Sequence, residues 1–243
     1  MFCNEVIIRP SGLEAVDLGL SVKWANMNVG ATIPTGKGHY FAWGEKEPQL
    51  IEEYSKEYFE KSSQPNYDKR SYKLCRGANN TLIKYCIQES RGTVDCKTEL
   101  EPVDDAATIS WGGKWRMPTK IEQEELRNKC FWQWTQSYKE TGIPGYIVFK
   151  AKCQSDKGLI RNMYKRDAPQ YSYALSDTHI FLPASGYFSD MQMMEVWTEG
   201  QYWSKSLDEK DSNEAVYLYM IRSGADWYSG DRYEGRSIRA VCE

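Results

Sequence analysis

The chain has 243 residues, with 31 basic and 34 acidic side chains and a formal net charge of -3. This balance predicts no basic surface for nucleic acid or for an anionic membrane. The mean hydropathy is -0.67, and no apolar run approaches the ~18–20 residues that a membrane span needs, so no membrane insertion is expected. The length suits one large domain or two small ones.

Aromatic residues make up 14% of the chain, with 9 Trp and 17 Tyr. Such use of large rings suits a loop-rich fold, and it also suits a surface that presents contacts to a ligand. Residues 1–5 lack the basic and apolar regions of a signal peptide.

Seven cysteines leave at least one thiol unpaired, and their spacings match no zinc template. Only Cys86 and Cys96 lie close in sequence, with Gly92 between them, as in the two strands of a short hairpin. Two interpretations stay open for this pair: a disulfide, or two buried thiols in a reducing compartment.

The first part of the chain predicts short strands joined by long loops. Residues 1–14 are expected to form a tail with one short strand. Alternation of Val22 and Trp24 with polar neighbours predicts a half-buried strand, and the aromatic run over residues 40–45 predicts another. Residues 46–80 are polar without periodicity, so we expect a long ordered loop there.

The most specific local signal is a helix start at Thr119. Thr119 and Glu122 have the spacing of a capping box, in which each side chain accepts the backbone N–H of the other residue. Pro118, just before the cap, biases Met117 toward extended geometry. The pattern predicts an extended segment that turns into a helix over residues 120–130.

The rest of the chain is richer in strand patterns. A short helical turn is expected over residues 100–107, strands are expected over residues 145–150 and 215–221, and an ordered segment is expected over residues 180–187. After a polar connection, residues 237–242 are expected to close the chain as a last strand. No repeat or linker composition separates two halves, so one α+β domain is predicted.

Longer motifs follow one another from about Ala15 to Cys242. They are residues 17–25 (DLGLSVKWA), 28–31 (NVGA), 40–45 (YFAWGE), 100–102 (LEP), 104–107 (DDAA), 111–113 (WGG), 115–119 (WRMPT), 181–184 (FLPA), 186–187 (GY) and 202–204 (YWS). In order and spelling these motifs resemble the major paralogous domain family (FISUMP type), found in surface proteins of gut bacteria. That family is in turn similar to proteins with a C-type lectin-like fold, which include the formylglycine-generating enzymes.

The resemblance implies a single C-type lectin-like domain with long ordered loops. It covers residues 15–243 and carries an insertion at about residues 151–178. In this fold the two ends of the domain pair, so residues 15–34 are expected beside residues 237–242.

Two finer expectations follow from the resemblance. Trp24 and Ile238 should lie in one core, since they sit on the two paired ends. Met27 stands where family members often have Cys, which puts in doubt any inherited disulfide at Cys130.

Few residues are suited to catalysis. His39 and His179 are the only histidines, which argues against a His-based triad or a site with several His ligands. The formylglycine-generating relatives use a cysteine pair in their C-terminal portion. Here that portion offers only Cys242, with Cys153 far upstream, so no such redox pair is expected.

Glu101, Asp104 and Asp105 form the one tight carboxylate cluster, and hard oxygen ligands suit calcium. Calcium-dependent lectins of this fold use other motifs for their metal site, and those motifs do not occur here. A helix-capping or loop-fixing role is therefore favoured for Asp104 and Asp105. No cofactor is expected.

The candidate binding surface lies between the last two predicted strands. Aromatic, Arg, acidic and Gly residues are mixed there, a composition like that of an antibody paratope. The alternative is a solvated loop whose rings fold back into the core. Additional contacts are expected from the loop between Asp190 and Trp197. The expected contact residues are Asp226, Trp227, Tyr228, Ser229, Asp231, Arg232, Tyr233, Glu234 and Arg236, with Tyr187, Phe188 and Asp190.

These observations predict a non-enzymatic protein that binds a protein or glycan receptor. The expected location is extracellular, at a cell surface or on a virus particle, and an oligomer is compatible with the sequence. Some C-type lectin-like proteins, phage receptor-binding proteins among them, are diversified near the C-terminus by retroelements, and the layout of this chain resembles theirs. The alternatives are a calcium-dependent lectin, a relative of the formylglycine-generating enzymes, and a structural subunit of a surface appendage.

Overall fold

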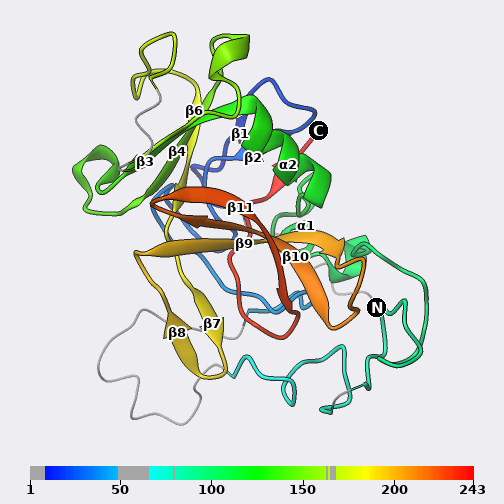
Figure 1. Cartoon of the computed structure of the whole chain (residues 1–243). Coiled ribbons are helices and arrows are strands. Elements are labelled where there is room, and N and C mark those ends of the chain that lie inside the picture. The colour runs from blue at the N-terminus through cyan, green and yellow to red at the C-terminus, as the bar shows by residue number, and fades with distance from the viewer. Residues whose placement is uncertain (1–8, 49–65, 79, 163, 165–167) are drawn as a thin grey trace, which may run out of the picture.

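The computed structural model describes residues 9–48, 66–78, 80–162, 164 and 168–243 (Figure 1). Within these residues short strands dominate, with a few helical segments, so the fold is mixed α+β as predicted. The elements are β1 Ala15–Val16, β2 Lys23–Ala25, η2 Pro102–Asp104, α1 Ala106–Trp111, α2 Lys120–Lys129, β3 Cys130–Thr135, η3 Tyr138–Glu140, β4 Gly145–Lys150, η4 Gln154–Asp156, β5 Ile160–Arg161, β6 His179–Pro183, β7 Tyr187–Ser189, β8 Gln192–Met194, β9 Glu199–Leu207, β10 Glu214–Ile221, β11 Gly224–Asp231 and β12 Val241–Cys242.

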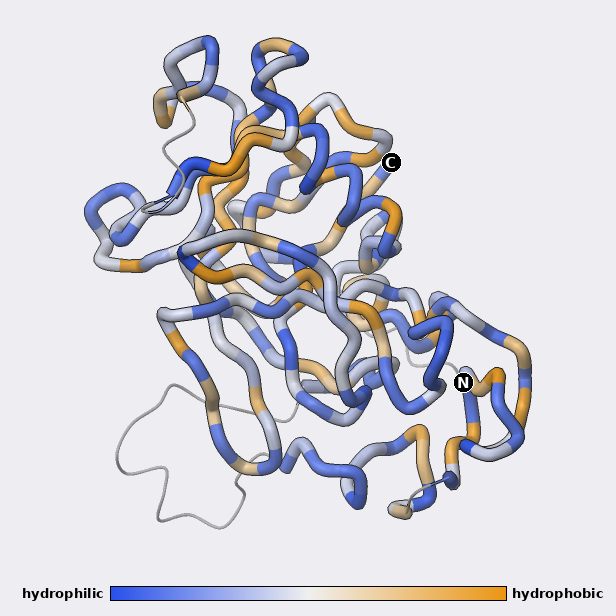
Figure 2. The backbone as a smooth tube through the Cα atoms, viewed as in Figure 1, coloured by the Kyte–Doolittle hydropathy of each residue, from blue (hydrophilic) through white to orange (hydrophobic). Residues whose placement is uncertain are grey.

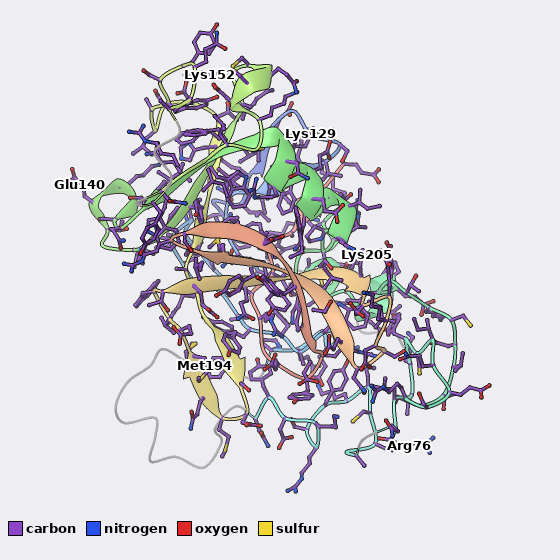
Figure 3. The ribbon with its side chains drawn as sticks, viewed as in Figure 1. Arg76, Lys129, Glu140, Lys152, Met194 and Lys205 are labelled. Atoms are coloured by element: carbon purple, nitrogen blue, oxygen red, sulfur yellow. The ribbon has the colours of Figure 1, made fainter. Side chains whose placement is uncertain are left out.

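The strands of the described residues form four sheets. The largest has the order β5-β3-β4-β6, and the others are β11-β10-β9, β1-β2-β12 and the hairpin β7-β8. The long strands β9, β10 and β11 cross the middle of the molecule in Figure 1, with the four-stranded sheet above them. The hairpin β7-β8, on which Met194 is labelled in Figure 3, projects away on the opposite side.

The sheet β11-β10-β9 separates two hydrophobic clusters. Trp203 and Tyr217 belong to one cluster, whereas their chain neighbours Tyr202 and Leu218 belong to the other. This division follows because successive residues of a strand point to opposite faces. In Figure 2 the strands β4 and β6 run as hydrophobic segments, in keeping with their burial in the second cluster.

The two ends of the domain pair as predicted. In the β2–β12 ladder Trp24 lies opposite Val241, so residues 15–34 do lie beside residues 237–242. The expectation of one shared core is wrong in detail. Trp24 packs in the cluster that contains Leu126 of α2, whereas Ile238 packs in the cluster that contains Trp203.

The capping box at the start of α2 is confirmed. The Thr119 hydroxyl accepts the Glu122 N–H at 3.2 Å, and the Glu122 carboxylate accepts the Thr119 N–H at 2.8 Å. The same carboxylate binds both terminal nitrogens of Arg116, at 2.6 and 2.8 Å. The helix ends at Lys129, because Cys130 begins β3. No helix among the described residues is both long and apolar enough to cross a bilayer.

Two predicted strands are replaced by irregular backbone. Residues 40–45 form no strand, because Phe41 and Trp43 donate their backbone N–H groups singly to the carbonyls of Arg236 and Arg232. At the C-terminus only Val241–Cys242 is a strand, while Ile238 and its neighbours are extended and buried. Most of the predicted N-terminal tail and residues 49–65 of the expected loop lie outside the described residues.

Of the two interpretations left open for Cys86 and Cys96, the disulfide is wrong, since both thiols are free. Cys86 is buried and donates its thiol to the Gln88 carbonyl at 3.1 Å, whereas Cys96 is exposed. The expected turn is nevertheless present, because the Cys96 N–H donates to the Cys86 carbonyl and Leu82 bridges to Gly92. Cys130 is likewise a free, buried thiol.

We predict that Thr119→Ala lowers the free energy of unfolding by about 1 kcal/mol. The substitution leaves the Glu122 N–H without its acceptor and loosens the carboxylate that binds Arg116. Urea denaturation of the variant and the parent measures the change. Thr32→Ala is the control, because exposed Thr32 caps no helix and should shift stability by less than ~0.5 kcal/mol. Equal losses in the two variants would contradict the assigned role of the cap.

We also predict that acid destabilises the fold through its histidines. Burial lowers the pKa of His39 and of His179 below the ordinary value of 6.5. The unfolded chain therefore takes up protons that the folded chain excludes, and stability is lost as the pH falls below that value. Between about pH 7 and about pH 5.5, the urea midpoint of His179→Gln should fall less steeply than that of the parent. Identical slopes would show that His179 does not contribute.

Candidate functional site

The stretch predicted as a binding loop is largely a strand. Residues 224–231 form β11, which pairs with β10 over its whole length, from Ile221 opposite Gly224 to Glu214 opposite Asp231. Only the turn that follows, from Arg232, has the irregular form that was expected. The candidate surface is thus carried by an edge strand of the sheet β11-β10-β9.

Because β11 is a strand, the expected single surface is divided between two faces of the sheet. Tyr228 lies opposite Tyr217, and Trp227 lies opposite Leu218. Paired residues share a face, and chain neighbours do not. Asp226 and Tyr228 therefore lie on the face of Tyr217, whereas Trp227 and Ser229 lie on the face of Leu218.

Three of the expected contact residues are buried, which corrects their assignment as ligand contacts. Phe188 is 1% exposed, Arg232 1% and Arg236 2%. Phe188 packs between the rings of Tyr40 and Tyr67, with centroids 5.1 and 5.5 Å away. These side chains lie beneath the surface and support it, so direct contact with a ligand is left to their exposed neighbours.

Arg232 is surrounded by groups that satisfy a guanidinium. Its plane lies over the ring of Trp43, 4.7 Å from the centroid. Its nitrogens donate to the Tyr72 hydroxyl at 2.9 Å and to three main-chain carbonyls at 2.9 to 3.1 Å, those of Lys84, Tyr85 and Ser212. Arg232 thereby connects the turn after β11 to the loop that precedes η2.

Arg236 lies between two rings of the sheet. Its guanidinium is 4.1 Å from the ring centroid of Tyr217 and 4.2 Å from that of Trp203. It donates to Gln201 at 2.6 Å and to the Glu234 carboxylate at 2.5 Å. Gly230 makes room for it, because a Cβ atom at that position would lie 2.5 Å from an Arg236 nitrogen.

Above Arg236 lies a group of accessible tyrosines that we call the tyrosine face: Tyr187, Tyr219 and Tyr228. Tyr228 is 53% exposed and packs edge-on against Tyr219, with centroids 5.2 Å apart. Tyr187 lies 5.6 Å from the Arg236 guanidinium. Sequence reasoning missed Tyr219, although the alternation of Tyr217 and Tyr219 along β10 is the signal that places them on one face.

The carboxylates of Glu199 and Glu234 lie near the tyrosine face, together with the guanidinium of Arg236. Glu199, which is 8% exposed, accepts a hydrogen bond from Gln201 at 2.6 Å, and burial raises the pKa of its carboxyl. Burial and the charge of Glu199 raise the pKa of Tyr219 to about 12. Burial also raises the pKa of Tyr187. These two tyrosines are therefore neutral hydroxyl donors at physiological pH.

The remaining candidate residues lie around this face or behind it. Asp190 is exposed in the turn of the hairpin β7-β8, and the Tyr233 hydroxyl donates to Asp231 at 2.8 Å. On the other face Ser229 donates to Asp208 at 2.6 Å, and half-buried Trp227 lines a cleft of about 450 Å³. Two separate surfaces therefore replace the single predicted one.

The weak metal candidates serve the loop structure. Asp105 is the N-cap of α1, since its carboxylate accepts the Thr108 N–H at 2.9 Å, and it also accepts the Met117 N–H. This confirms the capping role predicted for it. Asp104 and Glu101 both pair with Lys84. Within the described parts of the chain, no group of three His, Cys, Asp or Glu side chains converges to hold a metal ion.

Comparison with known proteins gives no match: no family model, no curated protein and no solved structure is significantly similar to the chain. Function is therefore inferred from the geometry of the candidate site.

We predict opposite outcomes for two substitutions within the candidate stretch. Arg232→Met leaves three buried carbonyls without donors, so it should lower the free energy of unfolding by about 3 kcal/mol or more. Tyr228→Ala removes an exposed ring and should change it by only ~0.5 kcal/mol. Chemical denaturation measures both variants. Arg76→Met, at an exposed arginine of the outer loop (Figure 3), controls for loss of a surface charge. Equal stability of the two arginine variants would overturn the structural role of Arg232.

Proposed function

We propose that this protein is a non-enzymatic receptor-binding protein with a C-type lectin-like fold. In this proposal the tyrosine face contacts a protein or glycan receptor on a cell surface, and the protein acts outside the cell or on a virus particle. The observation that carries the proposal is the packing of exposed Tyr228 against half-buried Tyr219, on a sheet that also holds buried Arg236 between two rings.

The physical argument is preorganisation. A tyrosine ring offers a large amphipathic contact area and has few rotatable bonds to fix on binding. Here the sheet and Arg236 already hold Tyr217 and Tyr187 in place, so little further ordering is needed. The hydroxyls provide hydrogen bonds, and Glu234 and Glu199 favour receptors with basic or hydroxyl-rich surfaces.

The same arrangement suits diversification by a retroelement, as proposed from the resemblance to variable proteins of this fold. Asp226 and Tyr228 are exposed, so they can change with small effects on stability. Arg232 and Arg236 are buried and support the surface, so they would stay constant. A variable surface needs such a fixed support.

Three alternatives make different predictions. A calcium-dependent lectin would gain thermal stability from added calcium, because a ligand that binds only the folded state stabilises it. An enzyme related to the formylglycine-generating enzymes would need paired thiols, and here Cys242 lies in β12 whereas Cys153 lies beside η4. A structural subunit of an appendage would assemble without any soluble ligand.

The test is binding of the labelled protein to immobilised glycans and to intact bacterial cells. Substituting both Tyr219 and Tyr228 by Ala should weaken binding by about 30-fold, since central aromatic contacts contribute about 2 kcal/mol or more. Tyr171→Ala is the matched control, because Tyr171 is 49% exposed but lies in the segment 151–178. Equal binding by the double variant and the control, with melting temperatures unchanged, would refute the assignment of the tyrosine face.

A further inference from the structure

A second cleft, of about 720 Å³, opens at the end of the sheet where β10 turns into β11. Four segments far apart in the sequence form its walls: the end of β3, the segment between β5 and β6, the loop before β9 and the β10–β11 turn. The lining residues are Trp134, Gln136, Tyr164, Trp197, Thr198, Ile221, Arg222 and Ser223. Of these, only Trp197 was expected to contribute to binding.

The walls are linked by hydrogen bonds, so the cleft is already formed without a ligand. The Asn162 side chain donates to the Ser223 carbonyl at 3.0 Å and accepts the Tyr164 N–H at 2.8 Å. On the other side the Tyr146 hydroxyl donates to the Ile221 carbonyl at 3.1 Å. The ring of Trp134 packs edge-on against Tyr146, with centroids 5.0 Å apart. A preformed cleft of this size is typical of a site for a small ligand.

Two of its rings are unusually accessible. Tyr164 is 60% exposed and Trp197 is 38% exposed. Trp197 also has a positive φ of 68°, a conformation that is uncommon for a bulky side chain. Its backbone is held there by an N–H donated to the Ala184 carbonyl at 2.8 Å. The fold thus keeps a large ring at the surface in a strained conformation, which is a feature of ligand sites.

The polar groups of the cleft select the kind of ligand. Gln136, Thr198 and Ser223 place amide and hydroxyl groups beside the rings. A lipid or other apolar ligand would desolvate these groups without offering them partners. A sugar ring satisfies both parts of the lining, because its C–H face packs on an aromatic ring while its hydroxyls form hydrogen bonds.

The charge of the cleft favours an acidic sugar. Among the lining residues that the structure describes, Arg222 is the one basic side chain, and its guanidinium lies 5.7 Å from the ring centroid of Tyr164. The ammonium of Lys37 lies 5.3 Å over the ring of Trp197. The Glu195 carboxylate accepts the Thr198 hydroxyl at 2.7 Å. Two basic side chains, Arg222 and Lys37, lie beside the rings of the cleft.

We propose that this cleft binds a glycan through a carboxylated sugar, stacked on Trp197 and Tyr164 with its carboxylate at Arg222. The site is independent of the proposed function, because it shares no residue with the tyrosine face. It is a second contact region, for a small acidic saccharide, at the end of the same sheet.

The test is isothermal titration with three acidic probes: trimers of galacturonic acid, trimers of glucuronic acid, and lactose carrying sialic acid. Each probe is paired with its carboxyl-reduced, neutral counterpart. At least one acidic probe should bind, and its neutral counterpart should bind roughly tenfold more weakly, the difference expected for loss of one charge-assisted contact. Arg222→Met should remove this preference, whereas Arg76→Met should keep it.

Trp197→Ala and Tyr164→Ala should each weaken binding of both members of a pair, whereas Tyr171→Ala should not. Two separate aromatic variants keep the test valid if one of them misfolds. Substituting Tyr219 and Tyr228 by Ala should leave binding of these small acidic probes unchanged while it weakens binding of the receptor at the tyrosine face, so failure of the tyrosine face and failure of this site can be told apart. The proposal is overturned if no acidic probe binds up to about 10 mM. It is also overturned if the preference for the acidic probe survives Arg222→Met. A third contrary result is that the cleft substitutions weaken binding of a protein partner while no saccharide binds.

Discussion

The folded state of this chain depends on three buried guanidinium groups and on the protein groups that replace water around them. Arg232, Arg236 and Arg239 are each 1 to 2% exposed. Moving an ion out of water costs several kcal/mol even after relaxation, so a buried ion must find other polar partners. Here those partners are mainly main-chain carbonyls and aromatic rings. Arg239 shows the principle, since it donates to Asn28 and to the carbonyls of Ala25 and Phe181.

This constraint explains how so irregular a chain holds one conformation. Some of the loops are fixed by carbonyls that accept hydrogen bonds from a buried arginine. The loop around Lys84 and Tyr85 is joined in this way to the turn after β11, because Arg232 donates to the carbonyls of both residues. Burial lowers the pKa of Arg239 to about 10, yet the group stays charged at physiological pH. The interior of the protein therefore contains charged, hydrogen-bonded arginines as well as apolar side chains.

The sequence predicted best what local chemistry decides. The Thr119 and Glu122 box defines the start of α2 because both partners lie within one helical turn. Residues 145–150 read correctly as a strand because they are apolar and β-branched, and they are buried in the four-stranded sheet. The pairing of the two ends was accessible only through a family resemblance, because no local pattern links residues so far apart.

The predictions that were wrong concern features that tertiary contacts decide and local sequence does not. The Gly- and Asp-containing stretch from Gly224 to Asp231 has low intrinsic strand preference, and it is a strand because β10 pairs with it. Arg232 and Arg236 were expected at the surface because Arg is seldom fully buried, and only the tertiary contacts reveal otherwise. The cleft beside Trp134 could not be anticipated, since its walls come from four distant segments.

The joining of β2 to β12 has a consequence for how the protein is made. Ala25 and Arg239 are 214 positions apart, yet the Arg239 side chain donates to the Ala25 carbonyl at 3.0 Å. During synthesis on a ribosome β2 therefore lacks its partner β12 until nearly the whole domain has emerged. Closing so long a chain segment is entropically costly, and folds dominated by such contacts form slowly. Until then Trp24 and its apolar neighbours are exposed to the cell's chaperones and proteases, so the time between synthesis and closure is the period of greatest risk for this protein.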